Sequence, residues 1–343
     1  MIGDTMQDWQ WWSDTWQHVL SAAKVSASDR VFLAFSFGPF IGFWSAHQAS
    51  VDRGAMVIPA GGLSSIARLE FLKQSTATVV CCTPTYAMHL VEVAQAEGFP
   101  LAELPVKRLI VAGEPGGSQM DVRNAIEKCW QAEVVDHAGA TEIGPWGFGW
   151  PDRCGLHVIE SSFIAEIIPL PGDANALQAT EAQRPLEDSV SRGPTKLNAS
   201  GQVGELVLTS LGRYGAPVIR YRTGDIVRAK LAESTNKDCQ FLWLPEGIIG
   251  RTDDMLTIRG VNVFPSSIDN LVRSLAATAE YQVRVDSSRC LQQITLNIEV
   301  DSETAARLQK LLASRLGLRI EVNCIPNGSL PRSDAKAKRW LRY

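Results

Sequence analysis

The sequence predicts an α/β fold. We expect a large domain built on a helix-covered, mainly parallel sheet plus a β-strand region, followed by a small α+β domain. Three observations lead to this expectation. Short apolar runs alternate with segments of helical periodicity over residues 1–150, strand patterns prevail after residue 150, and the residues beyond 250 follow a βαββαβ order of the ferredoxin-like type. The predicted domains span residues 1–250 and 251–343.

The first 150 residues alternate between two periods. Trp9, Trp12, Trp16 and Leu20 recur at helical spacing and predict an amphipathic helix over residues 5–24. Because strands alternate with helices, we expect a parallel sheet that binds ligands beyond the carboxyl ends of its strands. The other predicted elements are strands at 31–35, 55–58, 78–82, 108–112 and 133–135, and helices around Trp44 and Ala49 and at 65–74, 85–97 and 118–130.

Strand patterns dominate the middle of the chain, at residues 157–168, 204–209 and 218–221. Between the first two lies a stretch, 171–203, that is rich in Pro, Gly, Ala, Asp and Ser; it is expected to be an insertion, and the sequence indicates no function for it. The predicted small domain comprises a hairpin at 255–264, helices at 266–275 and 304–316, and strands at 281–286, 293–300 and 319–324.

The composition of the 343-residue chain is that of an ordinary globular protein, 45% hydrophobic and 20% charged. A net charge of −4 predicts neither a nucleic-acid nor a membrane-surface partner. No apolar run reaches the roughly 20 residues of a membrane helix, and the N-terminal residues do not form a secretory signal. We therefore expect a cytoplasmic protein. Its oligomeric state is left open, with a homodimer among the alternatives.

The seven cysteines do not form a disulfide framework, and we expect reduced thiols. Cys154 and His157 stand close together, with Cys129 and His137 upstream, and could contribute to a structural zinc site. Two ligands do not make a tetrahedral site, so buried core side chains are the favoured interpretation and zinc stays an open alternative.

Three loops at predicted strand ends have the chemistry of a nucleotide site. Residues 113–117 form a glycine-rich turn that lets the backbone approach a ligand closely. Thr141 next to Glu142 offers a hydroxyl and a carboxylate, which suit a phosphate oxygen and Mg²⁺. Asp225 follows a glycine turn and suits the two hydroxyls of a ribose. Each pattern by itself is also typical of a plain turn or helix cap.

Two more segments complete the pattern: G-R-T-D-D-M-L-T-I-R-G-V-N-V-F-P at 250–265 and P-R-S-D-A-K-A-K-R at 331–339. In order and separation the five segments resemble the adenylate-forming (acyl-CoA synthetase) superfamily, and the phenylacetate–CoA ligase family in particular, over essentially the whole chain. The resemblance implies an AMP-forming ligase that joins an aromatic, phenylacetate-like carboxylic acid to coenzyme A through an acyl-adenylate. ATP, Mg²⁺ and coenzyme A are the implied cofactors, and the acid, ATP and coenzyme A are the implied partners.

The resemblance also implies roles for single residues. A positioned ammonium can stabilise the negative charge that gathers during adenylation, which suits a catalytic lysine; a merely solvated basic tail is the alternative. Carried over position by position, the resemblance places Gly113, Glu114 and Pro115 along adenine, and Gly139, Thr141 and Glu142 in the adenine, phosphate and magnesium loop, with Glu142 as the metal ligand. It implies that Asp225 binds ribose and that Arg251 reaches the nucleotide. In the mobile C-terminal cap, Asp253 is the implied hinge, Arg259 and Gly260 face coenzyme A, and Lys336 bridges the carboxylate and the α-phosphate.

An aromatic run, F-S-F-G-P-F-I-G-F at 35–43, resembles the family stretch that lines the ring of the acid. Phe37 and Phe40 are the predicted pocket residues, because aromatic walls favour flat apolar acids. Core packing explains part of the run equally well. The loop at 83–86 is expected nearby.

One family motif is absent from these 343 residues: the [ST]-[ST]-G-T-T-G-K loop that grips the β- and γ-phosphates. The sequence thus matches a family member that begins downstream of this loop. Because losing one preorganised oxyanion donor costs about 3–4 kcal/mol, we expect these residues alone to adenylate poorly.

Two alternatives remain beside the ligase. One is an adenylate former that loads the thiol of a carrier protein, and the other is a non-catalytic fragment that binds a nucleotide or an acyl-CoA. Product analysis with different thiols separates the first, and nucleotide binding without turnover would favour the second.

Overall fold

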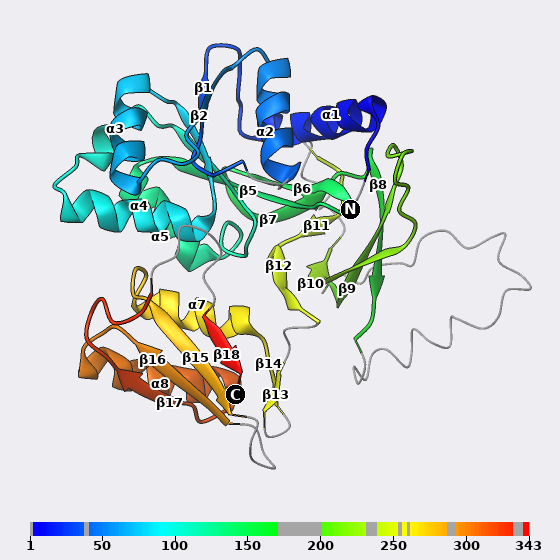
Figure 1. Cartoon of the computed structure of the whole chain (residues 1–343). Helices are drawn as coiled ribbons and strands as arrows, with labels where there is room; N and C mark the ends of the chain where they lie inside the picture. The colour runs from blue at the N-terminus through cyan, green and yellow to red at the C-terminus, as the bar shows by residue number, and fades with distance from the viewer. Residues whose placement is uncertain are drawn as a thin grey trace, which may run out of the picture.

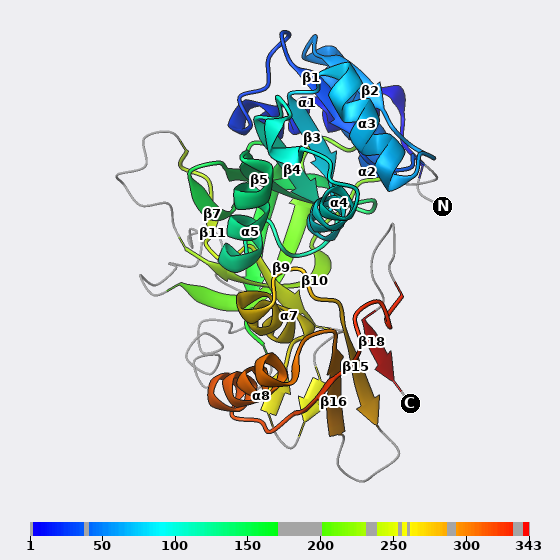
Figure 2. The same ribbon diagram turned by 90° about the vertical axis from the view of Figure 1, so that its left-hand side faces the viewer.

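The computed structural model describes residues 3–37, 41–170, 201–230, 239–252, 256–258, 261–286, 293–331 and 339–342. A large part with two sheets is followed by a smaller C-terminal part (Figure 1). The smaller part lies against one end of the larger in both views (Figure 2), where helix α7 (Pro265–Leu275) contacts helix α5 (Met120–Trp130).

An eight-stranded sheet forms the centre of the large part, in the order β2-β1-β3-β4-β5-β6-β7-β11. The pairs from β2 to β5 are parallel, as predicted, and β6, β7 and β11 extend the sheet with antiparallel pairs. The strands are β1 (Arg30–Leu33), β2 (Met56–Pro59), β3 (Val79–Cys82), β4 (Arg108–Ala112), β5 (Glu133–Ala140), β6 (Gly144–Trp150), β7 (Arg153–Val158) and β11 (Trp243–Leu244).

Helices cover both faces of this sheet, because successive side chains of a strand point to opposite faces. Val31 and Leu33 of β1 pack with the helices of one face, whereas Phe32 between them packs with those of the other. The first face carries α1 (Met6–Ala22) and α2 (Ile41–Asp52); the second carries α3 (Ser65–Ser75), α4 (Pro84–Ala96), the 3₁₀ helix η1 (Leu101–Glu103) and α5.

Local signals fix where these helices begin. Thr5 and Asp8 form a capping box at the start of α1, in which each side chain satisfies the backbone N–H of the other residue. The Thr83 hydroxyl caps α4 and is followed by Pro84 at the first helical position. Both helices therefore start within a residue or two of the predicted positions.

A second, antiparallel sheet has the order β12-β10-β9-β8 and consists of β8 (Phe163–Ile168), β9 (Gln202–Ser210), β10 (Tyr221–Ala229) and β12 (Ile248–Arg251). Its formation corrects one prediction. Residues 157–168 are not one strand, because a turn over residues 159–162 separates β7 in the first sheet from β8 in the second. Likewise, residues 218–220 precede β10 rather than belonging to it.

The C-terminal part is α+β, as predicted, and has a hydrophobic core of its own. The strand order differs in one respect from a ferredoxin-like βαββαβ unit. The hairpin β13 (Leu256–Ile258) and β14 (Val261–Val263) forms a separate two-stranded sheet, and the main sheet takes its fourth strand from the C-terminal end. That sheet has the order β17-β16-β15-β18, with β15 (Tyr281–Asp286), β16 (Gln293–Ile298), β17 (Glu321–Cys324) and β18 (Trp340–Arg342), and it packs with α7 and α8 (Ser302–Leu316).

Over the described ranges, none of the helices combines the length and the apolar character that crossing a membrane requires.

Candidate active site

The parallel strands place four candidate segments at one edge of the large sheet. β1, β3, β4 and β5 run in the same direction, so the residues that follow them meet beyond their carboxyl ends. These segments are 34–37, 83–86 and 113–117, together with the turn at 141–143 beyond β5. The predicted proximity of the phenylalanine, threonine and glycine-rich segments therefore follows from the sheet.

The strand before Thr141 and Glu142 is longer than predicted. β5 continues beyond residue 135 through Gly139 to Ala140, and β6 begins at Gly144, so a short turn joins two antiparallel strands. The side chains of Thr141 and Glu142 are exposed, whereas the next residue, Ile143, is buried. The turn therefore presents a hydroxyl and a carboxylate to solvent from a backbone anchored underneath.

Asp225 lies within strand β10, not after a glycine turn as predicted. The register of β10 against β9 shifts between Arg222 and Ile226, and Gly224 adopts a φ of +76°. Such a bulge re-aims side chains beside it, which gives the predicted glycine a different physical role. Asp225 Oδ1 accepts a hydrogen bond from Arg251 Nη1 at 3.0 Å, so the structure brings these two predicted nucleotide ligands together across β10 and β12.

Tyr221 joins this group, although the sequence interpretation gave it no role. Burial raises the pKa of the Tyr221 hydroxyl, and the carboxylates of Glu142 and Asp225 raise it further, whereas Arg251 opposes them. Tyr221 therefore senses the charges of Glu142, Asp225 and Arg251 together. The position of Tyr221 inside the R-Y-R-T-G-D motif is the signal that could have identified it.

Glu114 is engaged with the neighbouring loop rather than free. Its Oε1 accepts a hydrogen bond from the backbone N–H of Thr85, 2.7 Å away, at the start of α4. Gly113 before it has a φ of +92°, which a residue with a side chain adopts only at a cost. The loop after β4 is thereby tied to the loop after β3.

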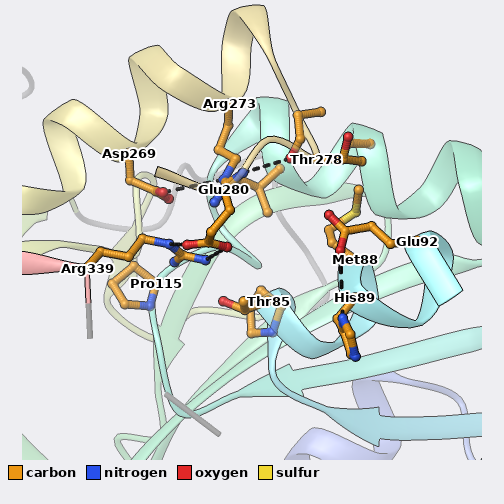
Figure 3. A pocket seen from close by; sticks show the side chains of 14 residues that line it. Thr85, Met88, His89, Glu92, Pro115, Asp269, Arg273, Thr278, Glu280 and Arg339 are labelled. Carbon is orange, nitrogen blue, oxygen red and sulfur yellow. Dashed lines mark hydrogen bonds and ion pairs between the residues drawn. The ribbon is translucent and has the colours of Figure 1, made fainter. Parts of the chain in front are cut away.

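Pro115 lines a pocket between the large part and the C-terminal part (Figure 3). The charged groups that line it are largely paired. Arg339 forms a bidentate pair with Glu280, with N–O distances of 2.6 and 3.1 Å, and the other pairs are Arg273–Asp269 at 3.4 Å and His89–Glu92 at 3.7 Å. The pocket beside the predicted adenine segment is therefore lined by charged groups that are paired with one another.

Phe37 belongs to an aromatic cluster at the end of β1. The centroid of its ring lies 4.8 Å from that of Trp44 and 5.6 Å from that of Phe35. The Phe35 ring stacks on that of Phe43, with a centroid distance of 4.0 Å. Trp44 is 47% exposed, so the cluster is not entirely core. Trp44 is an aromatic wall residue that sequence reasoning did not single out.

The buried carboxyl group of Asp136 lies next to the end of the glycine-rich loop. Asp136 on β5 accepts hydrogen bonds from the Ser118 hydroxyl and from the backbone N–H of His137. Burial raises the pKa of Asp136 to about 7, against the opposing effects of these two hydrogen bonds and of the Arg123 charge. The folded protein therefore holds this carboxyl protonated over a range in which the unfolded chain ionises it.

Asp136→Asn is expected to remove a pH dependence of stability. Because the folded pKa is above the ordinary 3.8, the stabilisation is present below about pH 4 and is lost as pH rises toward 7. Between about pH 4 and pH 7, the free energy of unfolding of the variant should therefore rise relative to that of the wild type by up to about 1.4 kcal/mol per pH unit. Urea unfolding at pH 5 and pH 7 measures the difference. His137, whose pKa burial lowers to about 4, has the opposite slope but is common to both proteins. Parallel pH profiles would contradict the assignment.

The zinc alternative receives no support from the described part of the chain, where no three His, Cys, Asp or Glu side chains gather as a metal site would require. His157 Nδ1 lies 3.2 Å from the carbonyl oxygen of Phe241, and Cys154 Sγ lies 3.7 Å from Met120 Sδ. Both residues are thus engaged with ordinary neighbours.

Five predicted site residues fall outside the described residues, and their roles stay predictions. They are Phe40, Asp253, Arg259, Gly260 and Lys336.

Comparisons with known proteins agree with this geometry. A family model described as the AMP-binding enzyme C-terminal domain matches residues 260–342. Phenylacetate–coenzyme A ligase of Pseudomonas putida is 27% identical over 98% of this chain and 74% of its own length, and the enzyme of the same name from Escherichia coli K12 is 28% identical over 99% and 75%. A structure of 2-hydroxyisobutyryl-CoA ligase in the postadenylation state has a TM-score of 0.86 at 24% identity and covers all of this chain and 71% of that one.

The fold is that of adenylate-forming CoA ligases, and residues 260–342 match the C-terminal domain of AMP-binding enzymes. Over nearly its whole length the chain is homologous to phenylacetate–coenzyme A ligases, at 27% and 28% identity.

Proposed function

We propose that this protein activates an aromatic, phenylacetate-like carboxylic acid with ATP and transfers the acyl group to coenzyme A. In the first step a carboxylate oxygen attacks the α-phosphorus, and the bond to pyrophosphate breaks. In the second step the sulfur of coenzyme A attacks the acyl carbon, and the bond to AMP breaks as the thiol loses its proton. Both steps place negative charge at the phosphate, which the site must stabilise.

The residues around Tyr221 are proposed to hold the nucleotide. Asp225 accepts the ribose hydroxyls, and Arg251, which already pairs with Asp225, reaches toward the phosphate. Thr141 and Glu142 offer hard oxygen donors of the kind that a phosphate-bound Mg²⁺ prefers, and both residues are exposed. Mg²⁺, when bound, would neutralise phosphate charge. The observation that carries the proposal is the hydrogen bond of 3.0 Å between Arg251 Nη1 and Asp225 Oδ1, which pairs two of the predicted nucleotide ligands.

The acyl group is proposed to lie against the aromatic cluster of Phe35, Phe37, Phe43 and Trp44. This cluster follows β1 at the same sheet edge as the nucleotide residues. Flat rings gain about 0.5–1.5 kcal/mol per aromatic contact beyond their buried area. An aromatic acid is therefore the favoured class.

Residues 251–343 are proposed to act as a cap that turns about Asp253 relative to residues 1–250. The comparison with 2-hydroxyisobutyryl-CoA ligase supports this proposal. At the same 24% identity, the TM-score is 0.86 for its postadenylation state and 0.64 for its thioesterification state, so the two parts of the present chain are arranged as in the former. The proposal places the reaction in the cytoplasm, where ATP and coenzyme A are available.

The second half-reaction gives the sharpest test, because it uses neither the β- nor the γ-phosphate. Phenylacetyl-adenylate and coenzyme A are mixed with the protein, and phenylacetyl-CoA and AMP are quantified by chromatography. Asp225→Ala should weaken AMP binding about 10- to 100-fold, the range expected when charge-assisted hydrogen bonds are lost. Asp152→Ala removes an equally arginine-paired carboxylate at the turn between β6 and β7 and should leave binding within about twofold.

Two results would overturn the proposal. One is a wild-type protein that neither binds AMP nor forms the thioester, and the other is an equal loss of AMP binding in both variants. Replacing coenzyme A by a carrier-protein thiol distinguishes the carrier-loading alternative, since a preference for the carrier would redirect the assignment.

A further inference from the structure

Arg213 lies beneath the turn that carries Thr141 and Glu142. Its Nη1 donates hydrogen bonds to the main-chain carbonyl oxygens of both residues, at 3.0 and 2.8 Å. The Arg213 side chain is fully buried, whereas the side chains of the two turn residues are exposed. The guanidinium therefore hydrogen-bonds to the backbone of the turn, while the Thr141 and Glu142 side chains stay exposed.

Asp4 holds this guanidinium from the opposite direction. Arg213 Nε and Nη2 donate to the two carboxylate oxygens of Asp4 at 2.6 and 2.9 Å, and the Trp12 ring lies 5.2 Å from the guanidinium carbon. Because the planar guanidinium is hydrogen-bonded to Asp4 on one edge and to the turn on the other, its orientation is fixed. The ammonium of a lysine at this position would lack that constraint. The position of the turn is thus coupled to the segment that precedes α1.

A second carboxylate strengthens the same connection. Asp8 accepts hydrogen bonds from the backbone N–H groups of Tyr214, at 2.6 Å, and Gly215. Burial alone would raise the pKa of Asp8, but these bonds and those from Thr5 lower it to about 2, so this carboxylate stays charged at neutral pH. Asp4 and Asp8, which lie on either side of the start of α1, therefore both bind the loop that carries Arg213.

We propose that Arg213 is a positioning residue for the nucleotide's phosphate and Mg²⁺, acting through the backbone of the Thr141–Glu142 turn with Asp4 as its anchor. The inference rests on the proposed function and deepens it. Arg213 touches neither substrate nor metal; it sets where the Thr141 hydroxyl and the Glu142 carboxylate are presented. A displacement of about 1 Å in such groups is enough to cost on the order of 100-fold in rate.

A double variant separates positioning from stability. Arg213→Met alone would leave the Asp4 carboxylate without its partner, whereas Arg213→Met combined with Asp4→Asn removes both charges together. Arg228→Met serves as the control, because Arg228 pairs with Glu246 at 2.7 Å on β10, the strand that also carries Asp225. Binding of ATP is measured by calorimetry with Mg²⁺ and with EDTA, at a temperature where thermal unfolding shows every variant to be folded.

The expected result is specific to the metal. In the double variant the affinity for ATP with Mg²⁺ falls about tenfold or more, and the gain in affinity that Mg²⁺ gives the wild type disappears, while the control stays within about twofold. A merely structural role would lower the melting temperature and leave the ratio of the two affinities unchanged. A wild type that binds and a double variant with the same ratio would overturn the inference alone. A wild type that binds neither ATP nor AMP would overturn the proposed function and the inference together.

Discussion

Lys336→Ala is expected to slow formation of the acyl-adenylate by about 100- to 1,000-fold, the loss that follows removal of one preorganised donor to a developing charge. The same variant should form thioester from preformed acyl-adenylate at close to the wild-type rate, because the lysine is proposed to bridge carboxylate and α-phosphate only in the first step. Single-turnover experiments with enzyme in excess measure both steps, even when the first is slow.

The described residues on either side of the segment that carries Lys336 are attached to the C-terminal part. The backbone N–H of Leu330 donates to Glu299 at 2.7 Å, and Arg339 forms its bidentate pair with Glu280. Glu299 N–H in turn donates to the Glu280 carbonyl oxygen at 3.0 Å, so the two attachments lie side by side at one end of the β15–β16 pair. Lys310→Ala on the exposed face of α8 is the control and should change neither step. Equal loss of both steps in Lys336→Ala would contradict the assigned role.

Arg123→Ala is expected to lower the free energy of unfolding by about 3–5 kcal/mol, since it removes a buried charge together with its partners' hydrogen bonds. The guanidinium is almost fully buried and donates to the carbonyl oxygens of Val134, Trp150, Pro151 and Arg153 and to Glu127. The Arg123 side chain thus links β5, β6 and β7 by hydrogen bonds, at the end of these strands opposite the Thr141–Glu142 turn.

Urea unfolding followed by tryptophan fluorescence measures this loss. Arg228→Ala, which removes a partly exposed ion pair with Glu246, should cost no more than about 1 kcal/mol. If the two variants had similar midpoints, the four carbonyl contacts of Arg123 would be shown to contribute little.

The sequence interpretation was most accurate where a single segment carries the signal. Strand β4 agrees with its prediction at both ends, and α1, α3 and α4 agree to within two residues, because apolar periodicity and capping residues such as Thr5 and Thr83 are local. It failed where a turn is defined by its partners. Neither the break between β7 and β8 nor the bulge at Gly224 can be recognised without the opposing strand.

The candidate site divides in the same way. The resemblance assigned Thr141, Glu142, Asp225 and Arg251 to one nucleotide site, and the structure pairs two of them, Asp225 and Arg251, across β10 and β12. Five other predicted positions, Lys336 among them, lie outside the described residues and remain predictions.

The sequence by itself determined the alternation of strands and helices, the family resemblance and the residue types of the predicted nucleotide site, because these depend on neighbours along the chain. Only the tertiary structure decided which buried groups support that site. Asp4 and Arg213 are 209 positions apart, and no periodicity relates them. Their pairing arises because α1 packs against β5 and β6, and burying two charges is tolerable only where each meets the other.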